Sequence, residues 1–133
     1  MQKGNGLDHY RSVNAYGAAS AENRNELILR MLVGAQDRLA TARGHMRRAE
    51  TAPKGEAIGK AIGIIDGLRA SLDLEQGGEI ASNLNDLYDY MNRRLVEANA
   101  ADQPELLDEV SGLLGEIRSA WEQITTSEQS QPA

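Results

Sequence analysis

Apolar residues recur at three- and four-residue spacing along four long segments of this sequence, and short polar or glycine-containing stretches separate the segments. The most regular of the four runs from Gly77 to Asn99. Its apolar positions are Ile80, Leu84, Leu87, Met91, Leu95 and Ala98. This spacing lines up one face of an α-helix. Asp89 and Arg93 lie four residues apart on the opposite side, which predicts an ion pair on an exposed helix face.

The first of these segments is predicted to begin at Asn23, where Asn23 and Glu26 have the spacing of a capping box. A helix of about 26 residues would then end before Pro53, because proline is tolerated in the first turn of a helix but not in its interior. The next helix would end at Gly77-Gly78, since glycine readily adopts the left-handed conformation found at helix C-termini. Asp102 is the predicted N-cap of the last helix, whose stripe ends at Ile124.

Four amphipathic segments with short connections predict an all-α fold, an antiparallel four-helix bundle. Before them, Leu7, Tyr10, Val13 and Tyr16 are spaced three apart. They predict a short helical or irregular segment packed over the bundle, because so short a helix is not stable alone. We expect a single domain over residues 1–124 with a flexible lead at 1–6, and a disordered tail at 125–133.

Composition excludes several classes of partner and site. The chain has 20 acidic and 14 basic residues, a net charge of -6 and no cysteine. An acidic chain without a basic stripe is not expected to bind nucleic acid, and disulfides and thiolate sites are excluded. The sequence has no apolar run of the ~18 residues that a membrane span needs, and its N-terminus does not resemble a signal peptide. We therefore expect a cytoplasmic protein that does not insert into membranes.

No arrangement of residues predicts an enzyme, a cofactor or a metal site. His9 and His45 lack the Glu-x-x-His spacing of bundle metal sites. Gly77-Gly78 is not followed by Lys-Ser or Lys-Thr, so it does not form a phosphate-binding loop. No serine has a histidine placed nearby to act as its base.

Two features leave alternatives open. Gly59, Gly63 and Gly67 repeat every four residues in a predicted helix, which indicates either a close helix crossing within the bundle or a groove for a partner helix. Residues 27–33 contain six apolar residues in seven, more than one helix face of a bundle needs. Some of them would form an exposed groove that binds another helix, or the whole helix would be buried or form a homodimer face.

Several motifs in one register resemble a known family. They are the run from Leu72 to Ala81 containing Gly77-Gly78-Glu79-Ile80, then Leu87-Tyr88-Asp89-Tyr90-Met91, Arg93-Arg94-Leu95, Ala98-Asn99, Leu107-Asp108-Glu109-Val110 and Arg118-Ser119-Ala120-Trp121. Tyr10-Arg11 and Glu26-Leu27-Ile28-Leu29 extend the likeness towards the N-terminus. Together they resemble the bacterial flagellar secretion chaperones called FliS.

The resemblance implies a cytosolic, non-enzymatic export chaperone. Such a protein binds the C-terminal segment of flagellin, which is disordered when free, prevents premature polymerisation and hands flagellin to the flagellar export apparatus. An export-gate protein or a co-chaperone is a further partner in this picture. The family fold is a helical bundle whose N-terminal segment lies over an apolar groove and is displaced by flagellin.

The resemblance also implies contacts with the partner at Tyr10 and at Leu7, the apolar residue before it. For the groove itself, the apolar stripes of the first two long helices supply the candidates. These are Leu27, Ile28, Met31, Leu32, Ile62 and Ile65. Met31-Leu32-Val33 stands where the family usually has Leu-Tyr-Asp, which leaves open which flagellin is bound. The alternative function is a self-associating helical adaptor or structural bundle, a homodimer when free, without specificity for flagellin.

Overall fold

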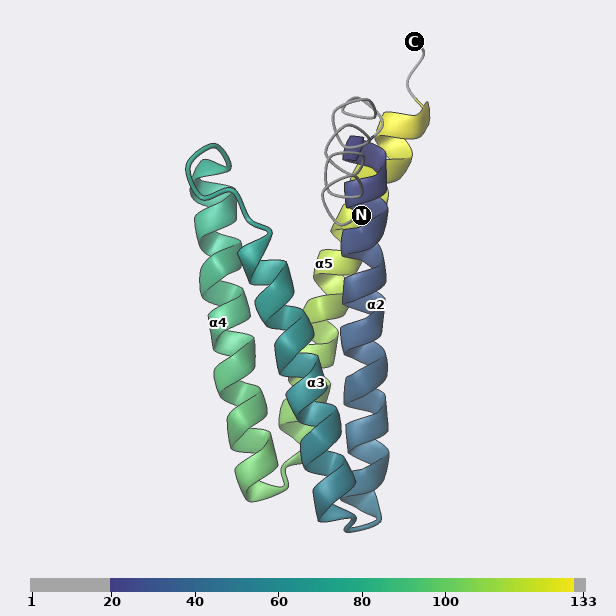
Figure 1. Ribbon diagram of the computed structural model, residues 1–133, viewed down its shortest axis with the longest axis vertical. Helices are drawn as coiled ribbons and strands as arrows, with labels where there is room; N and C mark the ends of the chain where they lie inside the picture. The colour runs from purple at the N-terminus through teal and green to yellow at the C-terminus, as the bar shows by residue number, and fades with distance from the viewer. Residues whose placement is uncertain (1–19, 131–133) are drawn as a thin grey trace, which may run out of the picture.

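The computed structural model describes residues 20–130, which form four helices and, within that range, no strand. They are α2 (Ser20–Arg47), α3 (Thr51–Ala70), α4 (Gly78–Ala101) and α5 (Pro104–Ser130). Consecutive helices run antiparallel (Figure 1), and each packs against two neighbours, so that α2 closes the ring against α5. The predicted all-α four-helix bundle is confirmed. The predicted N-terminal segment, including Leu7 and Tyr10, lies outside the described residues.

The core combines one apolar stripe from each helix. Leu32 and Leu39 of α2 are at most 2% exposed, and the regular stripe of α4 contributes Met91 and Leu95 with no exposed surface. The remaining large and fully buried side chains are Ile58, Ile65, Leu68, Leu107, Val110 and Leu114. Burying a Leu or Ile side chain stabilises a fold by about 1.5–3 kcal/mol, so these stripes supply the main driving force for the bundle.

The connection between α2 and α3 confirms the predicted break before Pro53. Ala49 adopts a left-handed conformation with φ 58°, and the amide of Glu50 donates to the carbonyl of His45 at 2.9 Å. This pattern closes a helix C-terminus. Pro53 lies in the first turn of α3, where its missing N–H costs nothing. The start of α2 differs from the prediction: the helix begins at Ser20, and Asn23 lies inside it, because no glycine or proline separates Asn23 from the preceding Ala-Glu pair.

The connection between α3 and α4 corrects the predicted end of α3. The helix ends at Ala70, seven residues before Gly77. The Ser71 hydroxyl donates to the carbonyl of Leu68 at 2.7 Å, and the Asp73 carboxylate accepts from the amide of Gln76 at 3.0 Å. Such local side-chain bonds compete with helix hydrogen bonds. Gly77 and Gly78 therefore start α4 rather than end α3, and Gly78 has a φ of 58°.

Asp102 is not the N-cap of α5. It is the left-handed residue that ends α4, with φ 50° and ψ 53°, and α5 begins at Pro104. Aspartate tolerates this conformation better than most residues, and proline suits the first position of a helix. The carboxylate of Asp102 accepts a hydrogen bond from Lys54 of α3, which holds Asp102 back towards the bundle and away from the start of α5.

The end of α5 also differs from the prediction. The helix continues through Ser130, past Ile124, so residues 125–130 are helical in place of the predicted disordered tail. No glycine follows Ile124, and the first proline after Pro104 is Pro132, so the sequence contains no residue that breaks the helix before that point. Residues 131–133 lie outside the described residues.

Candidate partner-binding site

The bundle contains an apolar cavity at the end where α3 connects to α4. Its volume is about 440 Å³, and every one of the four helices borders it. We call it the end cavity. It is lined by Arg24, Asn25, Ile28, Leu68, Ser71, Leu72, Asp73, Gly77, Ile80, Ala81, Leu84, Tyr88, Ile117 and Trp121. A concave, mainly apolar site of this size is typical of a ligand or peptide anchor.

The cavity follows from where the helices end. Towards the α3–α4 connection these two helices diverge from α2 and α5 (Figure 1). Because α3 stops at Ala70, Leu72 reaches the cavity from the connecting loop and is not held in a helical stripe. The apolar side chains of Ile28 on α2 and Leu84 on α4 both line the cavity.

Most polar groups around the cavity are already engaged. The Trp121 indole N–H donates to the main-chain carbonyl of Asn25 at 3.2 Å, which ties α5 to the first turns of α2. Ser71 and Asp73 make the loop bonds described above. Arg24 and Asp73 are exposed, so the charged groups lie at the solvent side and the interior is aliphatic and aromatic.

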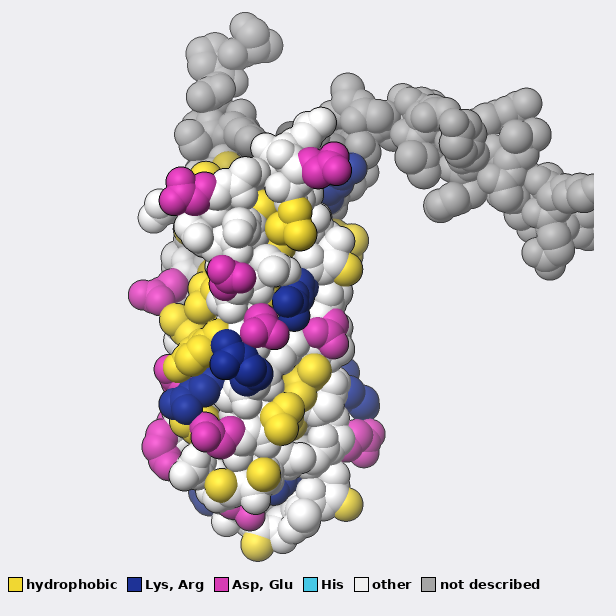
Figure 2. Space-filling view, turned by 90° about the vertical axis from the view of Figure 1, so that its left-hand side faces the viewer, with side chains coloured by type: hydrophobic (Ala, Val, Ile, Leu, Met, Phe, Trp, Pro, Cys, Tyr) yellow, Lys and Arg dark blue, Asp and Glu magenta, His cyan; other side chains and the backbone are white. Residues whose placement is uncertain are grey.

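Exposed apolar side chains also concentrate at this end of the bundle. Ile80, which lines the cavity, is 75% exposed. Of the four other large apolar side chains that are exposed among the described residues, Leu27 precedes Ile28, Leu74 follows Asp73 and Ile124 lies three residues after Trp121. The fourth is Val96, on α4. Figure 2 shows that the face presented by α4 carries apolar side chains interspersed with charged ones.

The residues predicted from the sequence do not form one surface. Ile28 lines the end cavity and Leu27, 56% exposed, lies beside it in the same turn. Met31 and Ile62 are half-buried at the edge of the core. Leu32 and Ile65 have no exposed surface, because both lie at the centre of their stripes.

Five main residues of the cavity were missed from the sequence, namely Ile80, Leu84, Tyr88, Ile117 and Trp121. All lie on regular stripes of the last two helices, which identify a helix face but not how far along it the core extends. The one sequence signal was the pair of residues Ser71 and Asp73, whose side chains commonly form hydrogen bonds in turns, which favours a loop at this point.

The six apolar residues at positions 27–33 lie in several different surroundings. Leu29 and Val33 line a shallow outer groove of about 350 Å³ between α2 and α5. Ion pairs flank this groove, Arg30 with Glu26 at 3.1 Å and Arg118 with Glu122 at 3.2 Å. The groove is therefore more open and more charged at its edges than the end cavity.

Of the four glycines of α3, the three that repeat at positions 59, 63 and 67 differ from one another. The methyl group of Met31 lies 2.9 Å from the position that a Cβ at Gly67 would occupy, so Gly67 allows α2 to pack closely. Gly59 and Gly63 are exposed and have no such neighbour within 4 Å among the described residues. A close crossing within the bundle thus explains Gly67 but neither of the other two.

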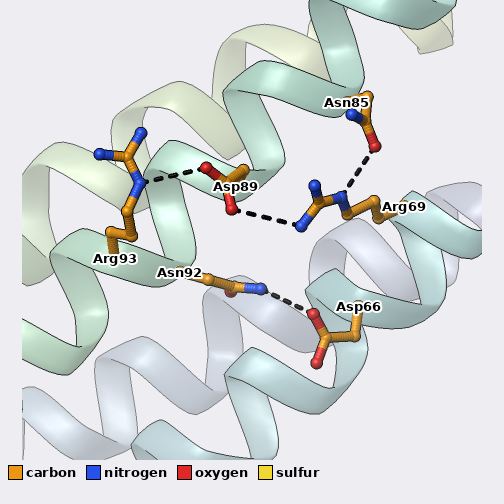
Figure 3. A network of polar contacts seen from close by, with 6 residues as sticks. All are labelled: Asp66, Arg69, Asn85, Asp89, Asn92 and Arg93. Atoms are coloured by element: carbon orange, nitrogen blue, oxygen red, sulfur yellow. Dashed lines mark hydrogen bonds and ion pairs between the residues drawn. The ribbon is translucent and has the colours of Figure 1, made fainter.

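A polar network joins α3 to α4 along their outer side (Figure 3). Arg69 donates to Asn85 at 2.8 Å and pairs with Asp89 at 3.3 Å, and Asp89 also pairs with Arg93 at 3.1 Å. The predicted pair of Asp89 and Arg93 is confirmed. Asn92 donates to Asp66 at 2.8 Å. The network fixes α4 relative to α3 below the end cavity.

A second cluster joins α4 to α5. The hydroxyl of Tyr90 donates to Glu109 at 2.6 Å, and Arg94 donates to the other carboxylate oxygen at 2.9 Å. These two hydrogen bonds, with that from Tyr90 the larger contribution, lower the pKa of the Glu109 carboxyl from its ordinary value. The three acids that join helices in these clusters each have a partner on the neighbouring helix: an amide for Asp66, an arginine for Asp89, and a hydroxyl and an arginine for Glu109.

Within residues 20–130, no three His, Cys, Asp or Glu side chains come together as metal ligands. His45 contacts Glu50 at 2.8 Å, whereas His9 lies outside the described residues. Among the described helices none is both long and apolar enough to cross a membrane.

Comparisons of the sequence with a family model and with individual known proteins agree with one another. Residues 6–128 match the family described as "Flagellar protein FliS". The chain is 50% identical over 119 residues to the flagellar secretion chaperone FliSB of Pseudomonas aeruginosa, a match that covers 90% of this chain and 94% of that one. It is 44% identical over 126 residues to flagellar secretion chaperone FliS of Salmonella typhimurium, covering 94% and 93% of the two chains. The corresponding protein of Bacillus subtilis is 33% identical over 103 residues, covering 77% of this chain and 76% of its own.

Proposed function

Because this chain belongs to the FliS family of flagellar proteins, we propose that it is an export chaperone for flagellin. It binds the C-terminal segment of flagellin in the cytoplasm, prevents premature polymerisation and hands the subunit to the export apparatus. The observation that carries the proposal is the end cavity, an apolar site bordered by all four helices. Hand-over brings in an export-gate protein or a co-chaperone as a further partner.

The end cavity has the chemistry needed to hold an unfolded segment. A segment that folds on binding loses about 2–5 kcal/mol to ordering, whereas each fully buried Leu or Ile contributes about 1.5–3 kcal/mol. Two or three apolar anchors are therefore required. We place them against Ile28, Leu84 and Trp121, with Leu27 and Ile80 as exposed apolar contacts at the edge.

The N-terminal segment of this chain is proposed to cover the same cavity when flagellin is absent. Nineteen residues precede Ser20, and the cavity begins one turn into α2, at Arg24 and Asn25. An extended chain spans about 3.3 Å per residue, so Leu7 and Tyr10 are within reach of it. In this proposal Leu7 and Tyr10 compete with flagellin for the cavity, so that the apparent affinity for flagellin is reduced.

The predicted groove residues take different parts in this proposal. Ile28 and Leu27 contact the partner directly, while Met31 and Ile62 are contacts only if the partner extends along the outer sides of α2 and α3. Leu32 and Ile65 have no exposed surface, so we assign them to the core and not to the contact surface.

Calorimetric titration of the full chain with a peptide of the flagellin C-terminal segment tests the function. We expect one peptide per chain and a negative heat-capacity change, since apolar surface is buried. Mass measured in solution, with and without the peptide, addresses the alternative of a self-associating adaptor. A stable homodimer that ignores the peptide would contradict the chaperone proposal.

A further inference from the structure

Tyr88 combines deep burial with a free hydrogen-bonding group. The side chain belongs to the regular stripe of α4 and is 3% exposed. It borders the end cavity. Buried hydroxyls in proteins nearly always have a hydrogen-bond partner, so the surroundings of this hydroxyl carry information about what the cavity holds.

No described residue offers the Tyr88 hydroxyl a hydrogen bond. Among the side chains that the structure describes, Asn92 Oδ1 is the one polar atom that is both wholly enclosed and unpaired. The Tyr88 hydroxyl is therefore not wholly enclosed, and Tyr88 is one of the residues that line the end cavity. Two residues later the hydroxyl of Tyr90 donates to Glu109, so the contrast arises from position and not from residue type.

The other polar groups of the inner cavity wall are not available in this way. The Trp121 indole N–H is bonded to the main chain of Asn25, and the Ser71 hydroxyl is bonded to the carbonyl of Leu68. An occupant that fills the cavity removes water from the Tyr88 hydroxyl. Unless the occupant supplies a hydrogen bond in return, this removal costs free energy.

The burial of Tyr88 also determines which kind of group can form a hydrogen bond with its hydroxyl. It raises the pKa of Tyr88, so the phenol stays neutral and keeps its proton to donate. A carboxylate as acceptor would bring an unpaired charge into an apolar space, which is far more costly than burying a neutral group. The fitting acceptor is an uncharged oxygen, such as that of an amide or a hydroxyl.

We propose that Tyr88 donates a hydrogen bond to an uncharged acceptor oxygen of the flagellin segment seated in the end cavity, and so determines which segments bind. The acceptor is a side-chain amide or hydroxyl, or a main-chain carbonyl left free at a helix end. A purely apolar segment of the same shape leaves the phenol without a partner and binds more weakly. This inference rests on the proposed function, since the occupant is the chaperone's export substrate.

The variants Tyr88→Phe and Tyr90→Phe test the inference as a matched pair, because each removes one hydroxyl from the same helix. Tyr88→Phe loses no internal hydrogen bond, so its melting temperature is expected to stay the same or rise, while its affinity for the flagellin peptide falls about two- to tenfold. Tyr90→Phe loses its bond to Glu109 and is expected to melt at a lower temperature with peptide affinity within about twofold of the parent.

A double-mutant cycle then locates the acceptor. Each Asn, Gln, Ser and Thr of the peptide is replaced in turn and titrated against the parent chain and Tyr88→Phe. A replacement that weakens binding to the parent but not to Tyr88→Phe identifies the acceptor side chain. If no replacement behaves so and Tyr88→Phe still binds more weakly, the acceptor is a main-chain carbonyl.

The two proposals fail in different ways. Equal affinity of the parent and Tyr88→Phe for the peptide would overturn the role of Tyr88 and leave the chaperone function intact. A folded parent chain that does not bind the peptide at all would overturn both.

Discussion

Lys54 of α3 and Asp102 at the end of α4 form an ion pair in which one partner is buried and the other is not. The Lys54 side chain is 4% exposed and that of Asp102 is 65% exposed. Lys54 also donates to the main-chain carbonyl of Asn99 at 2.9 Å. The pair joins the start of α3 to the α4–α5 connection, at the opposite end of the bundle from the cavity.

Removing the charge of Asp102 should therefore destabilise the bundle. Asp102→Asn keeps a residue that tolerates the left-handed conformation but leaves the buried Lys54 ammonium without its counter-charge. We expect a loss of about 1.5–3 kcal/mol, measured by urea unfolding. The double variant Lys54→Met with Asp102→Asn should recover part of that loss, and additive losses would contradict the coupling.

Ile80 and Val96 allow the site to be tested on a single helix. Both are exposed, at 75% and 60%, but only Ile80 borders the end cavity. Ile80→Asp should lower affinity for the flagellin peptide at least about tenfold, since an apolar contact of about 1.5–3 kcal/mol is lost. Val96→Asp is the control and should bind as the parent does. Equal effects in calorimetry would place the site elsewhere.

Gly77 and Gly78 should respond differently to alanine. A Cβ at Gly77 would lie 2.6 Å from the carbonyl oxygen of Asp73, whereas a Cβ at Gly78 meets no described residue within 4 Å but requires a φ of 58°. Gly78→Ala should cost about 1–2 kcal/mol through its backbone conformation alone. Gly77→Ala should cost more and should also weaken peptide binding, because the turn it distorts borders the cavity. Thermal unfolding ranks the two.

Gly63 tests whether the outer face of α3 contacts a partner. The position is helical and exposed, and no other described residue lies within 4 Å of an added Cβ, so Gly63→Ala should stabilise the chain by about 0.5–1 kcal/mol. Unchanged peptide affinity in this more stable variant would rule out a close helix contact there. Reduced affinity would show that the partner passes over the glycine.

Glu109 should make stability depend on pH on the acid side. The pKa of its carboxyl is lowered in the folded chain below the ordinary value of 4.5, so the folded state binds this proton less readily than the unfolded state. The stability that the Glu109 carboxylate contributes is therefore fully present above pH 4.5 and is lost as the pH falls through the pKa of the folded state. Glu109→Gln should therefore flatten the fall of melting temperature with acid, whereas an unchanged slope would assign that fall to other carboxyls.

The sequence predicts the helical bundle and the breaks near Pro53 and Gly77 because three- and four-residue periodicity reports directly which side of a helix is buried. It does not predict where a helix stops when side chains compete with the main chain. The bonds made by Ser71 and Asp73 accompany an end of α3 at Ala70, nearly two turns before the predicted end at Gly77. Because α3 ends at Ala70, Leu72 lines the end cavity from the connecting loop.

The residues of the candidate site were harder to predict than the helices themselves. Ile65 and Ile28 belong to equally regular stripes, yet Ile65 is at the centre of the core and Ile28 opens onto the cavity. An apolar stripe shows which side of a helix faces the core. It does not show how far along the helix the other three helices cover that side, and this coverage decides which residues are exposed at the site. Leu84 lies on the same predicted stripe as Met91 and Leu95, yet it is only partly buried and lines the cavity.

Trp121, which contacts Asn25, is an intrinsic fluorescence probe of the end cavity. Trp121 is the only tryptophan in the sequence, its ring borders the end cavity, and its indole N–H is held by the carbonyl of Asn25. Tryptophan emission therefore reports on this one site without a label. Filling the cavity with apolar side chains would shift the emission to shorter wavelength, so the arrival and departure of an occupant can be followed in real time in the unmodified protein.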